Sequence, residues 1–342
     1  MHNDPPPTRP ATRSLVLALA IAAGLAACIA PRANPGDTAA PTTHAGVVTP
    51  AASAAAKPSA SPRPGATAAA SATAPSPAPP VVLVGAGDIA SCGSSGDEAT
   101  ADLLDGIAGT VFTAGDNAYD SGTAAEFADC YAPTWGRHRA RTLPVPGNHD
   151  YVTAGGAGYF GYFGPAAGNP SVGWYATDLG AWRIYALNSD CWAIGGCEAG
   201  SAQERWLRDD LEASPRACVL AIWHHPRFSS GDHGSDPMTS ALWGALDDAG
   251  AEIVVNGHDH DYERFAPQDV NGAADPAGIV EYVAGTGGRS HYAFGPPLAN
   301  SLVRDNTAFG VLRFDLDAGG WASTFVPVAG ATFTDSATGT CH

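Results

Sequence analysis

Residues 252–260 read EIVVNGHDH, a short apolar run that passes through glycine into two histidines separated by one residue. The run 252–255 has the length and β-branched content of a buried strand. Alternate residues of an extended segment face the same side, so His258 and His260 are placed to act together. No hydrophobic core needs two adjacent imidazoles there, and the pair therefore indicates a metal site.

Four more apolar runs end in polar loops of the same kind. The strand-like runs 81–85, 110–113, 142–145 and 218–223 lead into Gly87-Asp88, Gly115-Asp116, Gly147-Asn148-His149 and His224-His225. Helical patterns follow at 97–108, 202–213 and 236–250, and strands alone at 279–284, 310–316 and 321–326. This alternation predicts an α/β fold, whose sites form at the carboxyl ends of strands. Glycine before the ligand allows the backbone to approach an ion or phosphate closely.

The polar loops share a set of oxygen and nitrogen donors that is too large for one metal. Two metals that share a carboxylate fit this set better. Taken singly, Gly-Asp after a strand is usually a turn or a helix cap, and Gly-Asn-His is mostly loop chemistry. The indication comes from all five loops in order, each at a strand end.

In order and local spacing these motifs resemble the calcineurin-like metallophosphoesterases, in particular the purple acid phosphatases, whose pattern is GDxG, GDxxY, GNH, VxxH and GHxH. The resemblance spans Val81 to about Gly288, and the run 257–264, GHDHDYER, is specific to that branch. It implies a four-layer α/β sandwich of two packed mixed sheets flanked by helices. The common pattern has a histidine two residues after its first aspartate, where this chain has Ala90. The resemblance implies that Tyr119 supplies that ligand instead.

Carried over residue by residue, the resemblance implies a ferric ion and a divalent ion (zinc, iron or manganese), with Asp116 as the bridge. The ferric ligands would be Asp88, Asp116, Tyr119 and His260, and the divalent ligands Asp116, Asn148, His224 and His258. Two such ions bind phosphate oxygens, lower the pKa of a bound water and direct its in-line attack on phosphorus. With two carboxylates and one phenolate the centre keeps a charge of about +2, so an acidic protein can still hold a phosphate.

Three histidines are candidate catalytic residues. His149 is the candidate to protonate the leaving oxygen, and its alternative role is to hold Asp116. His233, nine residues after His224, matches a histidine-bearing substrate loop of the family and is the second candidate acid. His225 either lines the pocket or makes a structural hydrogen bond.

Two further segments have a functional interpretation and a purely structural one. The aromatic run Tyr159 to Phe163 could stack on an aromatic or nucleoside leaving group, but local packing accounts for it equally. The turn 285–288, GTGG, could cradle phosphate with backbone N–H groups. Without a following helix or lysine, it is more typical of a turn at the rim of the site.

Charge and hydropathy exclude several classes of protein. The chain has 34 acidic and 17 basic side chains, a formal charge of −17, so no nucleic-acid polymer is expected as a partner. The one apolar run near the N-terminus is shorter than an ordinary membrane span, which argues against a transporter or channel. A small phosphate ester is the expected partner.

The N-terminal part of the chain predicts export. Arg9 and Arg13 precede an apolar run at 15–25, and Leu25-Ala26-Ala27-Cys28 resembles the bacterial lipobox. We therefore expect a lipoprotein-type signal peptide over 1–28, with ordinary cleavage and an unmodified Cys28 as the alternative. Residues 29–80, rich in Ala, Pro, Ser and Thr, predict a disordered linker, and 81–342 the catalytic domain.

Without Cys28, six cysteines are left, an even number in an exported chain, and three disulfides are plausible. Connectivity does not follow from the sequence. Cys191 and Cys197 bracket a glycine-containing loop that could close locally, Cys92 and Cys130 flank motif loops, and Cys218 with Cys341 would then hold the C-terminus.

These features predict an exported, lipid-anchored protein at the bacterial cell surface or outside it, which hydrolyses phosphate monoesters by attack of a metal-bound hydroxide. A phosphodiesterase or nucleotidase that uses the same site is one alternative. A non-catalytic surface lipoprotein that binds metal or phosphate is the other.

Overall fold

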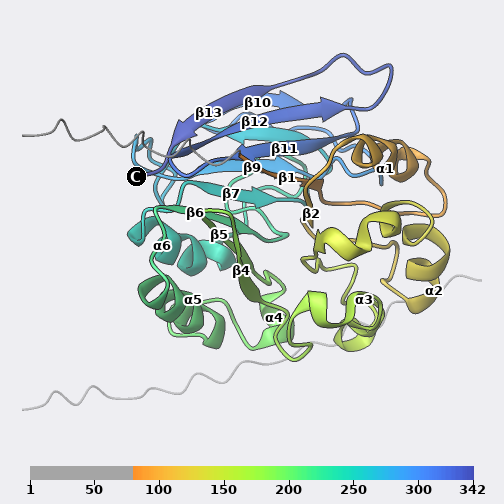
Figure 1. Cartoon of the computed structure of the whole chain (residues 1–342), viewed down its shortest axis with the longest axis horizontal. Helices are drawn as coiled ribbons and strands as arrows, with labels where there is room; N and C mark the ends of the chain where they lie inside the picture. The colour runs from red at the N-terminus through yellow and green to blue at the C-terminus, as the bar shows by residue number, and fades with distance from the viewer. Residues whose placement is uncertain (1–79) are drawn as a thin grey trace, which may run out of the picture. The chain divides into compact units, whose positions relative to one another are not determined.

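The computed structural model describes residues 80–342 (Figure 1). The predicted signal peptide, Cys28 and the linker up to residue 79 lie outside the described residues. Within residues 80–342, no helix combines the length and the apolar character that crossing a membrane requires.

The first of two sheets has six strands in the order β13-β12-β11-β1-β2-β3. Strands β1, β2 and β3 are parallel, and β11 pairs antiparallel with β1 and with β12. The strands are β1 (Val81–Ala86), β2 (Thr110–Thr113), β3 (Thr142–Leu143), β11 (Gly310–Leu316), β12 (Gly320–Pro327) and β13 (Ser336–Thr340). The sheet therefore joins the first motif strands to the C-terminal strands.

The second sheet has seven strands in the order β10-β8-β9-β7-β6-β5-β4. Its centre, β5-β6-β7-β9, is parallel, and β4, β8 and β10 pair antiparallel at its two sides. The strands are β4 (Tyr175–Leu179), β5 (Trp182–Ala186), β6 (Cys218–Ile222), β7 (Ile253–Asn256), β8 (Tyr262–Phe265), β9 (Val280–Ala284) and β10 (Ser301–Asp305). Both sheets are mixed, as predicted.

Neighbouring residues of one strand enter different cores. Leu83 packs between the two sheets, whereas Val84 faces the helices outside the first sheet. Val255 and Val254 of β7 divide in the same way between the inter-sheet core and the helices of the second sheet. Strands buried on both faces need continuous apolar runs, which is why these strands were recognisable in the sequence.

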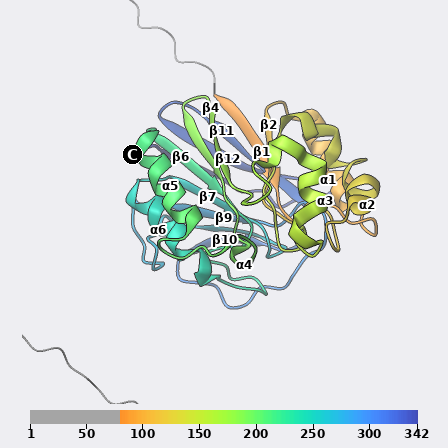
Figure 2. The same ribbon diagram turned by 90° about the horizontal axis from the view of Figure 1, so that it is seen from below.

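Helices cover the outer faces of the two sheets, so the predicted four-layer sandwich is confirmed. Figure 2 shows α5 and α6 on one side of the strands and α1, α2 and α3 on the other. The α-helices are α1 (Gly96–Gly106), α2 (Ala124–Glu126), α3 (Ala157–Phe163), α4 (Cys191–Ile194), α5 (Ala202–Ala213) and α6 (Ser240–Asp248). Short 3-10 helices span Trp135–Arg141, Ala154–Gly156, Gly164–Ala167 and Pro237–Thr239, and a π-helical turn spans Phe127–Tyr131.

Local signals explain the helix ends. Ser201 caps α5 by accepting a hydrogen bond from the backbone N–H of Glu204. Asp236 caps the 3-10 turn before α6 by accepting a hydrogen bond from the backbone N–H of Met238. Strand β3 is shorter than the predicted run 142–145, because Pro144 has no N–H to donate to a neighbouring strand.

Three disulfides are present, and each is a pair that the sequence left possible: Cys92–Cys130, Cys191–Cys197 and Cys218–Cys341. The last connects the start of β6 to the penultimate residue, 123 positions away. Disulfides of this kind are typical of proteins that fold in oxidising compartments, so they are compatible with export.

Candidate metal centre

The five motif loops meet where the parallel strands of both sheets end. The loop after β1 contacts the loop after β2 through the Asp88 N–H, which donates to the Gly115 carbonyl at 3.1 Å. The loop after β7 contacts the loop after β6 through the Gly257 N–H, which donates to the His224 carbonyl at 3.0 Å. The loops of the two sheets meet through the His258 N–H, which donates to Asp88 Oδ2 at 2.8 Å, so all of them form one site.

The first group of predicted ligands surrounds the Tyr119 hydroxyl. This oxygen lies 2.8 Å from Asp88 Oδ1, 2.9 Å from Asp116 Oδ2 and 3.2 Å from His260 Nε2. All four side chains are buried. The structure therefore brings together the four side chains that the resemblance placed on a ferric ion, including the tyrosine that compensates for Ala90.

The second group surrounds His224 Nε2. Asn148 Oδ1 lies 3.1 Å from this nitrogen, His258 Nδ1 3.3 Å and Asp116 Oδ2 3.4 Å. Asp116 Oδ2 is also the oxygen that contacts Tyr119. One carboxylate therefore touches both groups, as a bridging ligand must.

Backbone strain is concentrated at the same place. Asp88, Asp116 and His258 have φ angles of 60°, 49° and 72°, and within residues 80–342 no other non-glycine residue has a positive φ. Side chains with a Cβ adopt this left-handed region at a cost of about 1–3 kcal/mol each, and such residues cluster at functional sites. The surrounding fold therefore holds these three side chains in strained positions.

Two motif glycines are required by the close approach of neighbouring loops. A Cβ on Gly147 would lie 2.3 Å from Asp116 Oδ1, and one on Gly257 would lie 2.6 Å from Asp88 Oδ2. The sequence suggested that these glycines make room for an ion or phosphate. In the structure they make room for the carboxylates of other motif loops.

Hydrogen bonds orient two of the imidazoles. His224 Nδ1 lies 2.9 Å from the Ala114 carbonyl, which can only accept, so this nitrogen carries the hydrogen and Nε2 offers its lone pair to the site. His260 Nδ1 lies 2.7 Å from Ser290 Oγ, and its Nε2 faces Tyr119. Partners of this kind fix the ring orientation of metal-binding histidines in other proteins.

The donor set has an excess of negative charge. Burial and the carboxylates of Asp116 and Asp88 raise the pKa of Tyr119 well above its usual value. One hydroxyl hydrogen cannot satisfy both carboxylates at once. Burial opposes the charged form of His224, but Asp116 reverses this and raises the pKa of His224, because a positive charge is stabilised beside that carboxylate. A cation between these oxygens would supply the missing positive charge, so the residues fit metal ions.

The three candidate catalytic histidines surround these groups. The His149 N–H donates to Asp116 Oδ1 at 2.8 Å, and its ring lies 4.5 Å from the Tyr119 ring. The His233 ring stacks on His258 at 4.3 Å. His225 lies 4.4 Å from the His258 ring and 2.8 Å from Ser189 Oγ, so it both lines the site and makes a structural hydrogen bond. Burial and neighbouring His224 lower the pKa of His225 to about 3.

The segment after β9 adds residues that the motifs did not predict. The Arg289 guanidinium lies 5.0 Å from the Tyr119 ring centroid and 2.8 Å from Asp120 Oδ1. The Tyr292 ring stacks on His260 at 3.9 Å. The preceding turn is not a phosphate cradle, because the Gly285 and Gly287 N–H groups donate to backbone carbonyls. The only sequence signal for Arg289 was that it directly follows this turn, which was expected at the rim of the site.

Two carboxylates in the motif loops, Asp150 and Asp259, support the site through hydrogen bonds. Asp150 is buried and accepts hydrogen bonds from the Asn117 and Gly147 backbone N–H groups. Asp259 accepts from Ser229 Oγ and from the His233 N–H, which positions the loop that carries His233. Neither carboxylate was singled out from the sequence, because an aspartate that binds metal and one that only accepts hydrogen bonds are the same residue in a motif.

Comparison with known proteins agrees with this geometry. Residues 70–262 match the family model for calcineurin-like phosphoesterases. An uncharacterised protein of Mycobacterium tuberculosis is 31% identical over 147 residues, which cover 36% of this chain and 28% of that protein. Purple acid phosphatase 15 of Arabidopsis thaliana is 31% identical over 128 residues, which cover 36% of this chain and 23% of that protein. The chain thus spans about a quarter of the length of these relatives.

Among solved structures, the purple acid phosphatase PPD1 from yellow lupin seeds has the same fold, with a TM-score of 0.62 and 20% identity. The match covers 75% of this chain and 53% of the lupin protein. The family model covers more than half of the chain, and it includes all five motif loops. The chain therefore belongs to the calcineurin-like phosphoesterase family, and within it resembles the purple acid phosphatases.

Proposed function

We propose that the protein is a phosphatase that uses two metal ions to hydrolyse phosphate monoesters. The observation that carries this proposal is the shared carboxylate of Asp116, which touches both Tyr119 and His224. Family membership supports the reaction class, a hydrolase that acts on phosphoric esters.

The two groups of side chains divide by the chemistry of their donors. Carboxylate and phenolate oxygens suit a hard ferric ion, so Asp88, Tyr119 and His260 would hold it together with Asp116. The amide of Asn148 and the imidazoles of His224 and His258 suit a divalent ion such as zinc, iron or manganese. Once bound, the two ions would bind phosphate oxygens and activate a water for attack on phosphorus.

His149 is our candidate to protonate the leaving oxygen. Its Nδ1 lies 2.6 Å from the Asp120 carbonyl, which only accepts, so Nδ1 keeps its hydrogen. The proton that His149 can take up and give away is therefore the one on Nε2. Its backbone bond to Asp116 ties this imidazole to the bridging carboxylate.

Arg289 is our candidate to contact the phosphate. The whole chain has one lysine, Lys57, which lies outside the described residues. Among the described residues, Arg289 is the arginine that packs on a motif side chain, through the Tyr119 ring. Its ion pair with the exposed Asp120 holds the guanidinium there until a substrate oxygen replaces the carboxylate.

We further propose that the chain is exported and that Cys28 carries a lipid anchor. The three disulfides support export, and the sequence 25–28 supports the anchor. A Cys28→Ser protein that stays with the membrane fraction would contradict the anchor alone.

The test compares wild-type protein with His149→Ala on monoesters that have good and poor leaving groups, such as 4-nitrophenyl phosphate and an alkyl phosphate. We expect both metals to be retained, and turnover to fall by about 10²- to 10⁴-fold, chiefly on the alkyl ester. Equal losses on both esters would mean that His149 positions other groups. Wild-type hydrolysis of bis(4-nitrophenyl) phosphate but of neither monoester would replace our proposal with a phosphodiesterase.

A further inference from the structure

Two large apolar side chains are exposed beside the site. Trp192 is 68% exposed and Val152 61% exposed, more than any other large hydrophobic side chain in residues 80–342. Val152 belongs to the turn that begins at His149, whose carbonyl accepts from the Val152 N–H at 3.3 Å. Exposed apolar side chains that lie together beside a reaction site offer a binding surface to an apolar group of a ligand.

Hydrogen bonds tie the segment before Trp192 to two motif loops. Ser189 Oγ accepts from the His225 backbone N–H at 2.9 Å. Asn188 Nδ2 donates to the Tyr151 hydroxyl at 2.7 Å, and the Tyr151 ring meets the Trp192 ring edge to face at 5.8 Å. Trp192 and Val152 therefore flank Tyr151 at one margin of the site.

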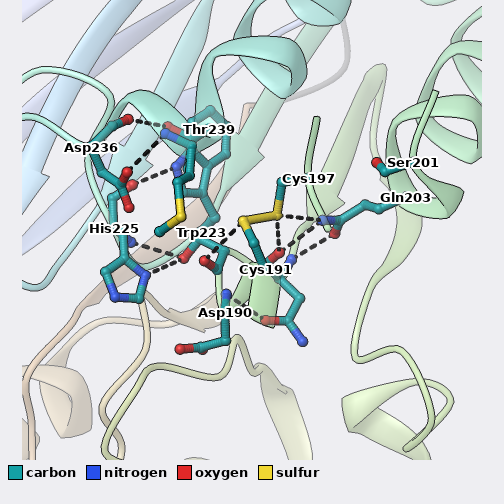
Figure 3. Close-up of a disulfide and its surroundings, with 12 residues drawn as sticks. Asp190, Cys191, Cys197, Ser201, Gln203, Trp223, His225, Asp236 and Thr239 are labelled. Carbon is teal, nitrogen blue, oxygen red and sulfur yellow. Dashed lines mark hydrogen bonds between the residues drawn. A yellow bond between two sulfur atoms is a disulfide. The ribbon is translucent and has the colours of Figure 1, made fainter. Parts of the chain in front are cut away.

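The backbone that carries Trp192 is fixed although its ring is exposed. The Cys191–Cys197 disulfide (Figure 3) closes a loop that contains Trp192, and both cysteines are buried. The Gln203 side chain exchanges two hydrogen bonds of 2.8 Å with the Asn188 backbone. Because this backbone is already fixed, only the Trp192 side chain has to be ordered when a ligand binds, which favours recognition.

We propose that Trp192 and Val152 form a subsite for the leaving group of the substrate, and that this group is a planar aromatic ring. The inference rests on the proposed function, because a leaving group that His149 protonates must pass the turn 149–152. The segment Tyr159–Phe163, which the sequence offered for this role, packs in the core, with Tyr159 and Phe163 buried. The exposed aromatic side chain next to the turn 149–152 is therefore Trp192, which contacts Tyr151.

The test is calorimetric binding of two phosphonates, which cannot be hydrolysed, to the metal-loaded full chain. We expect Trp192→Ala to weaken binding of 2-phenylethylphosphonate by about 3- to 10-fold, the usual range for one aromatic pair, and to leave ethylphosphonate unchanged. Trp192→Phe should restore most of the affinity. Leu302→Ala removes a side chain of similar exposure, 57%, from the edge strand β10 and should change neither ligand.

Equal effects of Trp192→Ala on the two phosphonates, or none, would overturn the subsite. Rates of hydrolysis by Trp192→Ala distinguish the source of the ring. If the rate falls for adenosine 5′-monophosphate but not for ribose 5-phosphate or 2-phenylethyl phosphate, the ring is that of a nucleoside. If it falls only for 2-phenylethyl phosphate, the ring is an aryl group. A wild-type protein that discriminates between the phosphonates but hydrolyses no monoester would refute the proposed function and leave the subsite standing.

Discussion

Asp190 gives the protein a pH-dependent stability that can be measured. This residue follows β5 and lies next to the disulfide at Cys191 (Figure 3), and it is buried. Among the described residues, neither of its carboxylate oxygens has a hydrogen-bond partner. Burial disfavours the charged form and outweighs the opposing effects of His224 and the Trp192 side chain, so the pKa of Asp190 is raised to about 7.

The sign follows from which state holds the proton. An unfolded aspartate has a pKa of about 3.9, so between about pH 4 and 7 the unfolded chain has released a proton that the folded chain keeps. The free energy of unfolding therefore falls as the pH rises through this window. The pKa shift of about three units, at 1.36 kcal/mol per unit, lowers the free energy of unfolding by about 4 kcal/mol by pH 8. Asp190→Asn removes this dependence.

Urea unfolding of chelator-treated protein with intact disulfides measures the effect. The difference in unfolding free energy between Asp190→Asn and wild type should move in favour of the mutant by up to about 4 kcal/mol between pH 4 and 8. Asp209→Asn, which changes an exposed carboxylate on α5, is the matched control. If the Asp190→Asn and wild-type curves stay parallel over this range, the buried carboxyl does not titrate as argued.

Two further substitutions test the site. Gly147→Ala places a methyl group against Asp116 Oδ1, so metal content should fall and kcat/KM should drop by about 10- to 100-fold. Gly161→Ala is the control, because its Cβ would meet nothing within 4 Å, and it should behave as wild type. A Gly147→Ala protein that keeps its metal and its activity would refute this packing argument. Asp120→Asn frees Arg289 and should lower KM for a phosphate monoester by about 2- to 5-fold. An unchanged or higher KM would show that the pair positions Arg289 usefully as it stands.

Much of the fold could be predicted because its strands are apolar on both faces. The predicted runs 110–113 and 310–316 coincide with β2 and β11, and the predicted helix 202–213 coincides with α5. Antiparallel strands at the sides of the second sheet were missed. Strand β8 reads Tyr-Glu-Arg-Phe, and its buried Glu263 accepts from the Ser230 N–H at 2.7 Å. Its two polar residues interrupt the apolar pattern from which the other strands were predicted.

The candidate site was predictable where a side chain follows a strand of the parallel core. Position at a strand end places such residues together without further information. Arg289, Trp192 and Asp190 follow no motif, and they reach the site through turns, a disulfide and a salt bridge that depend on the finished fold. The proposed metal ligands beside them were recognisable in the sequence, whereas these three residues required coordinates.

The most direct test of a two-metal phosphatase is how the rate of phosphate monoester hydrolysis depends on the number of metal equivalents added. Metal-free full-length protein is titrated with iron and zinc, and the rate of 4-nitrophenyl phosphate hydrolysis is followed. We expect no rate without metal and a plateau at about two equivalents per chain, because Asp116 joins two ligand groups. Hydrolysis that needs no metal, or a plateau at one equivalent, would contradict a two-metal phosphatase.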